Sequence, residues 1–401
     1  MSKENLVPKL SERDSRAVES QYRLTFAVPV ARQSGYVVDT VLNLLERTSV
    51  DCEIVVSVDS APRLARKLRS LSGEGRLKII ETPKPLSMAG NYEFLLRQLD
   101  AEWISFLGHD DSLLLNGERQ IRQAISCAES QGLRAITFPR SYFNWPGAAR
   151  EYYGYDYLIS KPRSNRIVNS SRLASMARIG LANHFDLPEI YTNAVIHRSL
   201  VADLRLSQGS VFAEPIPDTF SGVSVADTVR RHLAWGTSAF WTGSSDQSSG
   251  LVTRTSGLRV PDHIKRAVRE GRTFGIPTYA WLAFNCTPAF VISARRTLHK
   301  PKGTIGALSI LDLASMQASF QKRAGTGIFP AREIFRASAY LNETFPKVVA
   351  ALVFSLPLRL ALFGVRLVKV LGSFSRRRGI FAKVKGSGVS HYKQVPGDAL
   401  L

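Results

Sequence analysis

The regular alternation of strand and helix patterns over the first 140 residues is the feature that most constrains the fold. Leu24, Phe26, Val28 and Val30 alternate along a strand, and a stretch with helical spacing follows them. The alternation continues through further strand patterns at 52–58, 77–81, 103–107 and 133–138. Strands separated by helices of this length are joined by right-handed crossovers. The sequence therefore predicts an α/β fold with a Rossmann-like, mostly parallel sheet flanked by helices.

Polar residues follow these strands at their carboxyl ends, where sheets of this kind bind ligands. Arg32 follows the first strand, Asp59 follows the second, and His109, Asp110 and Asp111 follow the fourth. The first strand is not followed by G-x-G-x-x-G, and the chain contains no G-x-x-x-x-G-K-[ST]. The pattern therefore argues against a dinucleotide site and against a P-loop.

Asp110 and Asp111 directly follow a hydrophobic strand, and this position predicts a site for a divalent cation. Mg²⁺ or Mn²⁺ held there could bridge the phosphate oxygens of a diphosphate leaving group and neutralise its developing charge. One or two protein carboxylates suffice, because the ion takes its other ligands from substrate and water. A solvated turn with a helix cap is the simpler alternative.

Four stretches between Arg23 and Leu115 have the order and spacing of one half of a known enzyme domain. They read LTFAVPVARQSGYVVDTVLNLLER, EIVVSVDS, SMAGNYEFLL and WISFLGHDDSLL. In this order they resemble the opening strand and helix, the second strand, the segment near the donor sugar and the acidic metal motif of family-two glycosyltransferases. The resemblance implies a GT-A fold and an enzyme that uses a nucleotide-sugar donor.

The same resemblance implies donor-binding roles for individual residues. Pro29 and Arg32 would flank the nucleotide base, and Asp59 would accept a hydrogen bond from its imide N–H. Asn91 would contact the sugar or the ribose. Apart from the resemblance, Asp59 could simply end a strand or cap the next helix, and Asn91 could be a surface residue of a helix.

The resemblance also implies roles for the residues of the acidic motif. Asp110 would be the main ligand of the metal ion, with Asp111 as a further ligand and His109 beside the nucleotide sugar. Gly108 stands where the family often has the first Asp of a D-x-D motif, so the motif here is G-H-D-D. The cofactor implied is Mg²⁺ or Mn²⁺.

Asp218 is the candidate general base. An acceptor hydroxyl must lose a proton as it attacks the anomeric carbon, so inversion requires a carboxylate opposite the leaving group. The stretch EPIPDTFSG supplies Asp218, 108 positions after Asp110, with Glu214 close by. In the resembled family a Pro-Asp or Glu-Asp segment at a similar distance often has this role. A plain turn is the alternative, because Pro-Asp favours turns.

Two other segments could adjoin the site. The stretch GSSDQSSG, at 243–250, resembles a loop that follows the catalytic region in some members of the family, and a plain linker is the alternative. Seven aromatic residues between Tyr142 and Tyr157 could stack on the sugar faces of an acceptor. Packing against the sheet is the more common explanation for such residues.

The C-terminal part is strongly basic. The chain carries a net charge of +20, and residues 344–397 contain ten Lys or Arg residues and no Asp or Glu. Arg359, Arg366 and Lys369 fall on one side of a helix whose other side is apolar, which predicts a basic amphipathic helix in an anionic membrane interface. Packing on the catalytic domain and membrane spanning are the alternatives.

These patterns divide the chain into four parts. We expect a loose leader over 1–21, a GT-A catalytic domain over 22–255, a helical extension over 256–343 and a membrane-associating tail over 344–401. The N-terminus lacks the apolar run of a secretory signal, and the three cysteines form neither a disulfide framework nor a metal cluster. We therefore expect a cytoplasmic protein on the inner face of the cell membrane.

Together, the patterns predict an inverting glycosyltransferase. It would move a sugar from a nucleotide diphosphate donor to a saccharide or lipid-linked acceptor, as in polysaccharide biosynthesis. The alternative is a non-catalytic basic protein on a degenerate transferase fold, which would bind nucleic acid or an anionic membrane. Nucleic acid is the less favoured partner, because an acidic pair at a strand end would not serve a protein that binds the phosphate backbone.

Overall fold

The computed structural model describes most of the chain up to residue 320 and isolated positions beyond it. The described residues are 22–31, 34–71, 73, 75–251, 262–276, 287–299 and 309–320, followed by 350, 353–354, 357, 360, 381–384 and 391. The expected leader over 1–21 lies outside them. So does most of the expected tail, including Arg359, Arg366 and Lys369.

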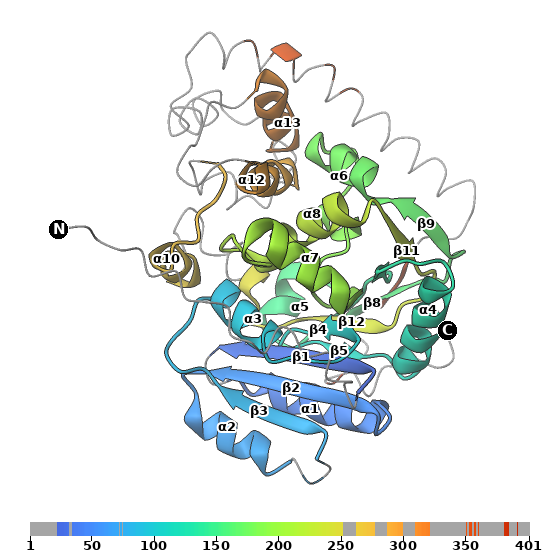
Figure 1. The fold of residues 1–401 in the computed structure, drawn as a ribbon, viewed down its shortest axis with the longest axis vertical. Coiled ribbons are helices and arrows are strands. Elements are labelled where there is room, and N and C mark those ends of the chain that lie inside the picture. The colour runs from blue at the N-terminus through green and yellow to red at the C-terminus, as the bar shows by residue number, and fades with distance from the viewer. Residues whose placement is uncertain are drawn as a thin grey trace, which may run out of the picture.

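A large sheet forms the centre of the fold, with strand order β3-β2-β1-β4-β10-β6-β11-β9 (Figure 1). Its strands are β1 (Leu24–Ala31), β2 (Cys52–Asp59), β3 (Leu77–Glu81), β4 (Trp103–Phe106), β6 (Ala135–Thr137), β9 (Arg166–Asn169), β10 (Ala194–His197) and β11 (Arg231–Ala234). β1 runs parallel to β2 and β4, β2 runs parallel to β3, and β6 runs parallel to β11. β10 runs antiparallel to β4 and β6, and β9 runs antiparallel to β11. The expected mostly parallel α/β sheet is confirmed, and the antiparallel strands are features that the sequence pattern did not predict.

Helices cover both faces of this sheet (Figure 1). They are α1 (Tyr36–Arg47), α2 (Pro62–Arg69), α3 (Met88–Leu96), α4 (Gly117–Glu129), α7 (Arg198–Gln208) and α8 (Pro217–Val229). Successive residues of a strand point to opposite faces. Phe26 and Val28 accordingly pack with α1, α2 and α4, whereas Ala27 packs with α3, α7 and α8. Because both faces of β1 are covered, its apolar run is buried almost throughout.

A smaller sheet has the strand order β13-β8-β7-β12-β5. Its strands are β5 (Ser112–Leu113), β7 (Ser141–Asn144), β8 (Tyr157–Ser160), β12 (Phe240–Ser244) and β13 (Phe381–Val384), and α5 (Ala148–Tyr153) lies between β7 and β8. Phe143, Trp145 and Tyr157 are buried in its core, so packing accounts for these three aromatic residues. β13 pairs with β8, and residues 381–384 of the expected tail therefore belong to this sheet.

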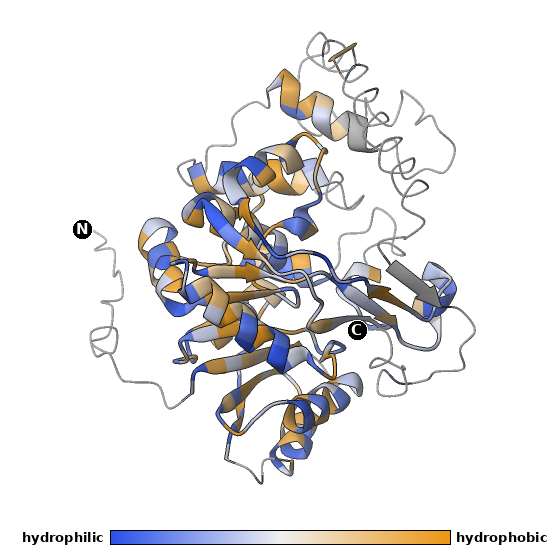
Figure 2. Ribbon diagram, turned by 90° about the vertical axis from the view of Figure 1, so that its right-hand side faces the viewer, coloured by the Kyte–Doolittle hydropathy of each residue, from blue (hydrophilic) through white to orange (hydrophobic). Residues whose placement is uncertain are grey.

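The remaining described elements are helical. They are α6 (Ser170–Arg178), the 3₁₀ helix η2 (His184–Asp186), α10 (Asp262–Arg269), α12 (Thr287–His299) and α13 (Ile310–Phe320). Ala177 of α6, Phe220 of α8 and Val291 of α12 share one apolar cluster. Figure 2 shows that helices around the sheets carry both hydrophobic and hydrophilic residues, as helices with one buried side do. Within the described residues, no helix combines the length and apolar character that crossing a membrane requires.

Candidate functional site

The carboxyl ends of β1, β2 and β4 meet at one edge of the large sheet. Pro29 is buried in β1 opposite Ser57 of β2. Asn91 of α3 joins the two strands: its amide donates to the Val30 carbonyl (3.2 Å), and its carbonyl oxygen accepts from the Ser57 hydroxyl (2.6 Å). The structure therefore brings Pro29 and Asn91 to this edge, and Asn91 is buried rather than on the surface. Arg32 lies outside the described residues.

Asp59 is buried at the end of β2. Its Oδ1 accepts hydrogen bonds from the Thr82 hydroxyl (2.7 Å) and from the Leu86 N–H (3.3 Å). Its Oδ2 lies 3.6 Å from the guanidinium of Arg266, on α10. The chain turns immediately afterwards at Ser60, whose φ of 57° is rare for a residue with a side chain. One carboxylate oxygen is therefore held by the fold, while the other faces a partly exposed arginine.

Asp111 is a buried anchor between segments. Its Oδ2 accepts from the Gly108 N–H (2.5 Å) and from the Thr192 hydroxyl, and its Oδ1 accepts from the Gly243 N–H (2.6 Å). Burial, reinforced by the charge of Asp110, raises the pKa of Asp111 to about 6. Because donors occupy both oxygens, the main contribution of Asp111 is to tie the end of β4 to β12.

Asp110 is held through one oxygen. Its Oδ2 accepts from the Ser245 N–H (3.1 Å), the Ser245 hydroxyl (2.7 Å) and the Ser248 hydroxyl. The Trp145 indole N–H donates to the Asp110 carbonyl (3.1 Å). Within the part of the chain that the structure describes, no hydrogen-bond donor contacts Oδ1 of Asp110. This is the carboxylate oxygen that a cation could bind.

The polar loop 243–250 is part of this site. A Cβ at Gly243 would lie 1.7 Å from the Asp110 carbonyl oxygen, so the close approach of the two backbones requires glycine. The Tyr36 hydroxyl donates to Asp246 Oδ1 (2.9 Å) and so ties the loop to α1. The sequence predicted that loop 243–250 and the aromatic segment 142–157 could adjoin the site. It did not predict the specific contacts of Ser245 and Trp145 with Asp110.

His109 has a buried ring nitrogen beside the acidic pair. Its backbone carbonyl accepts from the Thr40 hydroxyl (3.0 Å), which also donates to the Asp111 carbonyl (2.8 Å). Among the described residues, Nε2 of His109 is buried and has no hydrogen-bond partner. An unpartnered buried polar atom carries a free-energy cost, and a bound ligand would remove it. Depending on the tautomer, Nε2 can donate a hydrogen bond to a phosphate oxygen or coordinate a cation.

Asp218 belongs to the same cluster of ionisable groups. It lies in the first turn of α8, and burial raises its pKa. Tyr92 and Tyr191 each interact electrostatically with Asp218, Asp110 and Asp111, and with burial these carboxylates hold the pKa of both tyrosines well above 10. The candidate base and the acidic motif therefore act electrostatically on the same two tyrosines, although they are far apart in sequence.

Glu214 has a different environment. Its Oε1 accepts from the Thr297 hydroxyl (2.6 Å), the Ser293 hydroxyl (2.8 Å) and the Gly275 N–H (3.1 Å). Burial raises the pKa of Glu214 to about 7. Two of these donors come from α12 and one from the segment after α10, so Glu214 fastens both to the start of α8. We therefore interpret it as a structural residue.

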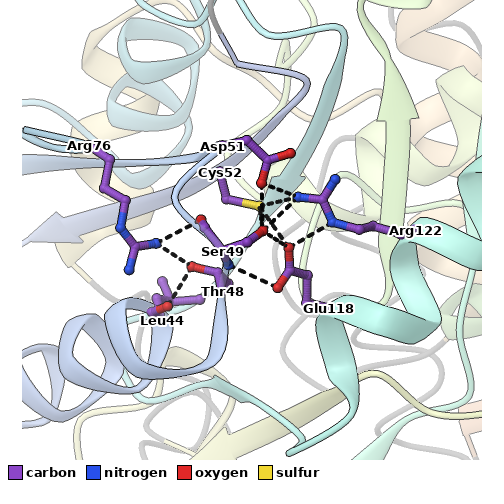
Figure 3. A network of polar contacts seen from close by, with 8 residues as sticks. All are labelled: Leu44, Thr48, Ser49, Asp51, Cys52, Arg76, Glu118 and Arg122. Atoms are coloured by element: carbon purple, nitrogen blue, oxygen red, sulfur yellow. Dashed lines mark hydrogen bonds and ion pairs between the residues drawn. The ribbon is translucent and has the colours of Figure 1, made fainter. Parts of the chain in front are cut away.

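A second group of potential metal ligands lies at the opposite end of β2. Asp51, Cys52 and Glu118 offer ligand atoms within 4.8 Å of one another. Figure 3 shows the Arg122 guanidinium among them, 2.6 Å from Asp51 and 2.7 Å from Glu118. Burial, with the charge of Glu118, raises the pKa of the Cys52 thiol to about 12, so it is not a thiolate at neutral pH. Because the guanidinium of Arg122 already lies among these groups, we interpret the cluster as a set of contacts that hold β2 and α4 together.

Comparison with known proteins gives similarity to solved structures only. No family model matches the chain, and no curated protein matches it. S. aureus TarS 1-349 in complex with UDP-GlcNAc is 12% identical, with 89% of this chain and 92% of that chain covered and a TM-score of 0.48. The mannosyltransferase PcManGT from Pyrobaculum calidifontis, in complex with GDP-Man and Mn²⁺, is 16% identical, with 83% and 87% covered and a TM-score of 0.40. A longer S. aureus TarS chain is 14% identical with a TM-score of 0.40, and this chain spans only 42% of it.

Proposed function

We propose that this chain is an inverting glycosyltransferase that uses a nucleotide diphosphate sugar and transfers the sugar to a saccharide or lipid-linked acceptor. The observation that carries the proposal is the open Oδ1 of Asp110 at the end of β4, beside the ends of β1 and β2. Asp59 lies at the same edge and can accept a base imide N–H. A cation site next to a base-recognising carboxylate suits a nucleoside diphosphate donor.

Asp110 would hold the divalent cation, Mg²⁺ or Mn²⁺, and carboxylate oxygens are the ligands these ions prefer. When bound, the cation would neutralise charge that develops on the diphosphate leaving group. Ser245 and Ser248 fix the rotation of the Asp110 carboxylate and leave Oδ1 open. Asp111 would act behind it by fixing the backbone, and His109 would face the donor phosphates.

Asp218 would act as the general base. It would accept the proton of the acceptor hydroxyl while that oxygen bonds to the anomeric carbon. The bond between this carbon and the diphosphate oxygen breaks at the same time, and its electron pair leaves with the nucleoside diphosphate. Attack on the face opposite the leaving group inverts the anomeric configuration.

Nucleotide titration tests the donor assignment. We expect calorimetry with UDP, GDP and their sugars to show binding that strengthens with Mn²⁺ and weakens with a chelator. Asp59→Ala should weaken nucleotide binding by roughly tenfold or more, because it removes a buried, charged hydrogen-bond acceptor. Asp100→Ala is the matched control, because Asp100 is exposed and precedes the amino end of β4, away from the carboxyl ends of the strands. Salt-dependent binding of nucleic acid without any binding of nucleotide sugars would favour the non-catalytic alternative.

We also propose that part of the tail contacts an anionic membrane at the inner face of the cell membrane. Val353, Phe354 and Leu360 stand at helical positions with 60%, 60% and 72% of their surface exposed. Exposed apolar side chains in a basic segment are typical of interfacial helices. β13 and His391, whose ring lies 5.4 Å from that of Trp145, return to the catalytic region. The membrane-contacting part would therefore precede residue 381.

Co-sedimentation with anionic vesicles tests this contact. Replacing both Phe354 and Leu360 by serine should lower binding by roughly tenfold or more, because each removes an apolar side chain from the interface. High salt should release only part of the wild-type protein, since apolar insertion resists screening. Leu206→Ser is a matched control, because Leu206 is 87% exposed on α7. If the double variant bound as tightly as this control, we would abandon the membrane assignment.

A further inference from the structure

A buried ion pair lies next to the candidate base. The guanidinium of Arg140 is 2.5 Å from Glu189 Oε2, and the two side chains are only 8% and 0% exposed. Arg140 also donates to Asn193 Oδ1 (3.0 Å), and its guanidinium lies 4.4 Å above the Phe185 ring. Three partners thus fix the position of this cation. Burying two charges is costly, so such a pair contributes little to stability by itself.

Two polar atoms of the pair form no hydrogen bond within the described residues. Among the described residues, Arg140 Nε and Glu189 Oε1 are buried and have no hydrogen-bond partner. A pair that served packing alone would be expected to satisfy these atoms, since each unsatisfied buried group destabilises the fold. Burial raises the pKa of Glu189, and the guanidinium of Arg140, 2.5 Å away, opposes this. The close guanidinium favours the ionised form of Glu189, so the charge of Glu189 in turn offsets part of the charge of Arg140.

Hydrogen bonds connect the segment that contains Glu189 to the first turn of α8, which contains Asp218. The Ile190 N–H donates to the Ser221 hydroxyl (3.0 Å), which in turn donates to the Asp218 carbonyl (2.8 Å). α8 approaches so closely at Gly222 that a Cβ there would lie 2.7 Å from Glu189 Cγ. The ion pair and Asp218 are therefore held in a fixed relation.

Arg140 is the cation that acts on Asp218 within the described residues. Burial raises the pKa of Asp218, and the hydrogen bond from the Thr219 N–H and the charge of Arg140 oppose this. The other ionisable groups that interact with Asp218 are Tyr92 of α3, Tyr191 and Glu189. None of them can supply a positive charge, so Arg140 is the charged group that, together with the Thr219 N–H, favours the ionised form of Asp218.

We propose that Arg140, held by Glu189, is a positioning residue that keeps Asp218 ionised and ready to accept the proton of the acceptor hydroxyl. The inference rests on the proposed function, in which Asp218 is the base. In this proposal, the negative charge of Glu189 determines how strongly Arg140 stabilises the ionised form of Asp218.

The pH profile of sugar transfer tests this proposal. An ionised base is required, so the wild-type kcat should fall as pH drops through the pKa of Asp218. Arg140→Met should move this acid limb to higher pH by about one unit or more, and raising the pH should restore the rate. Arg140→Lys, which keeps the charge, should keep the limb close to its wild-type position. Glu189→Gln should move it in the opposite direction, because the charge of Arg140 is then unopposed. Mn²⁺-dependent binding of UDP or GDP, measured by calorimetry, should stay unchanged in all three.

Opposite shifts in the two charge-changing variants are not expected from a merely structural pair. Identical limbs in Arg140→Met, Glu189→Gln and wild type would overturn the proposal, as would a pH-independent loss of rate in both. If Arg140→Met does not fold, as judged by thermal melting, the shift in Glu189→Gln decides the question. Asp218→Asn is measured in parallel. Normal transfer by that variant would refute the base assignment itself, and this result is distinct from unshifted limbs in an enzyme that needs Asp218.

Discussion

Asp110→Ala is expected to abolish sugar transfer and to remove the Mn²⁺ dependence of nucleoside diphosphate binding. The substitution takes away Oδ1, the open carboxylate oxygen at the end of β4, and with it the ligand proposed for the cation. Neutralising the charge of a leaving group contributes several kcal/mol, so the rate should fall by about 10³ or more. Transfer assays with Mn²⁺ or with a chelator, together with nucleotide calorimetry, measure both effects.

Folding must be separated from metal binding in this experiment. Asp110→Ala leaves the donors of Ser245 and Ser248 without their acceptor, which destabilises the fold by about 1–3 kcal/mol. Asp110→Asn retains an oxygen for these donors and is the matched variant, since it removes only the charge. Asp111→Asn should instead mainly lower the melting temperature, because Asp111 accepts hydrogen bonds from three segments. Unchanged transfer in folded Asp110→Ala would rule out the metal assignment.

Asp218→Asn is expected to lower transfer by roughly 10²–10⁴ while donor binding survives. The amide keeps the shape of the carboxylate and cannot accept a proton at neutral pH. It still offers an oxygen to the Thr219 N–H, which is bonded to Asp218 Oδ1 (2.9 Å), so the start of α8 should be preserved. Steady-state rates at saturating donor and acceptor measure the effect.

Glu214→Gln is the comparison for this second result. Glu214 holds Thr297, Ser293 and Gly275, so the variant should lose stability and keep most of its transfer rate when folded. A rate loss in Glu214→Gln as large as that in Asp218→Asn would contradict the separation of structural and catalytic roles. Wild-type rates in Asp218→Asn would show that the base is elsewhere.

The sequence by itself determined the elements and the edge at which they present polar groups. Apolar periodicity is local. It predicted strands at Leu24–Val30 and at 52–58, and the structure has β1 at Leu24–Ala31 and β2 at Cys52–Asp59. The rule that ligands bind at the carboxyl ends of parallel strands then placed Asp59 and Asp110 at one edge. Boundaries were predicted less closely: the pattern predicted a strand over 133–138, whereas β6 spans only Ala135–Thr137. Side-chain pattern does not encode where backbone hydrogen bonding stops.

Only the tertiary structure decided what each polar residue does. Asp110 and Asp111 are adjacent and chemically identical, yet loop 243–250 leaves Oδ1 of Asp110 open while distant donors occupy both oxygens of Asp111. Arg140 and Glu189 belong to no recognisable motif, and their pairing depends on contacts between separate segments. The availability of a carboxylate depends on how many donors surround it and on how deeply it is buried. Both quantities are set by residues far away in sequence, so spacing and periodicity cannot predict them.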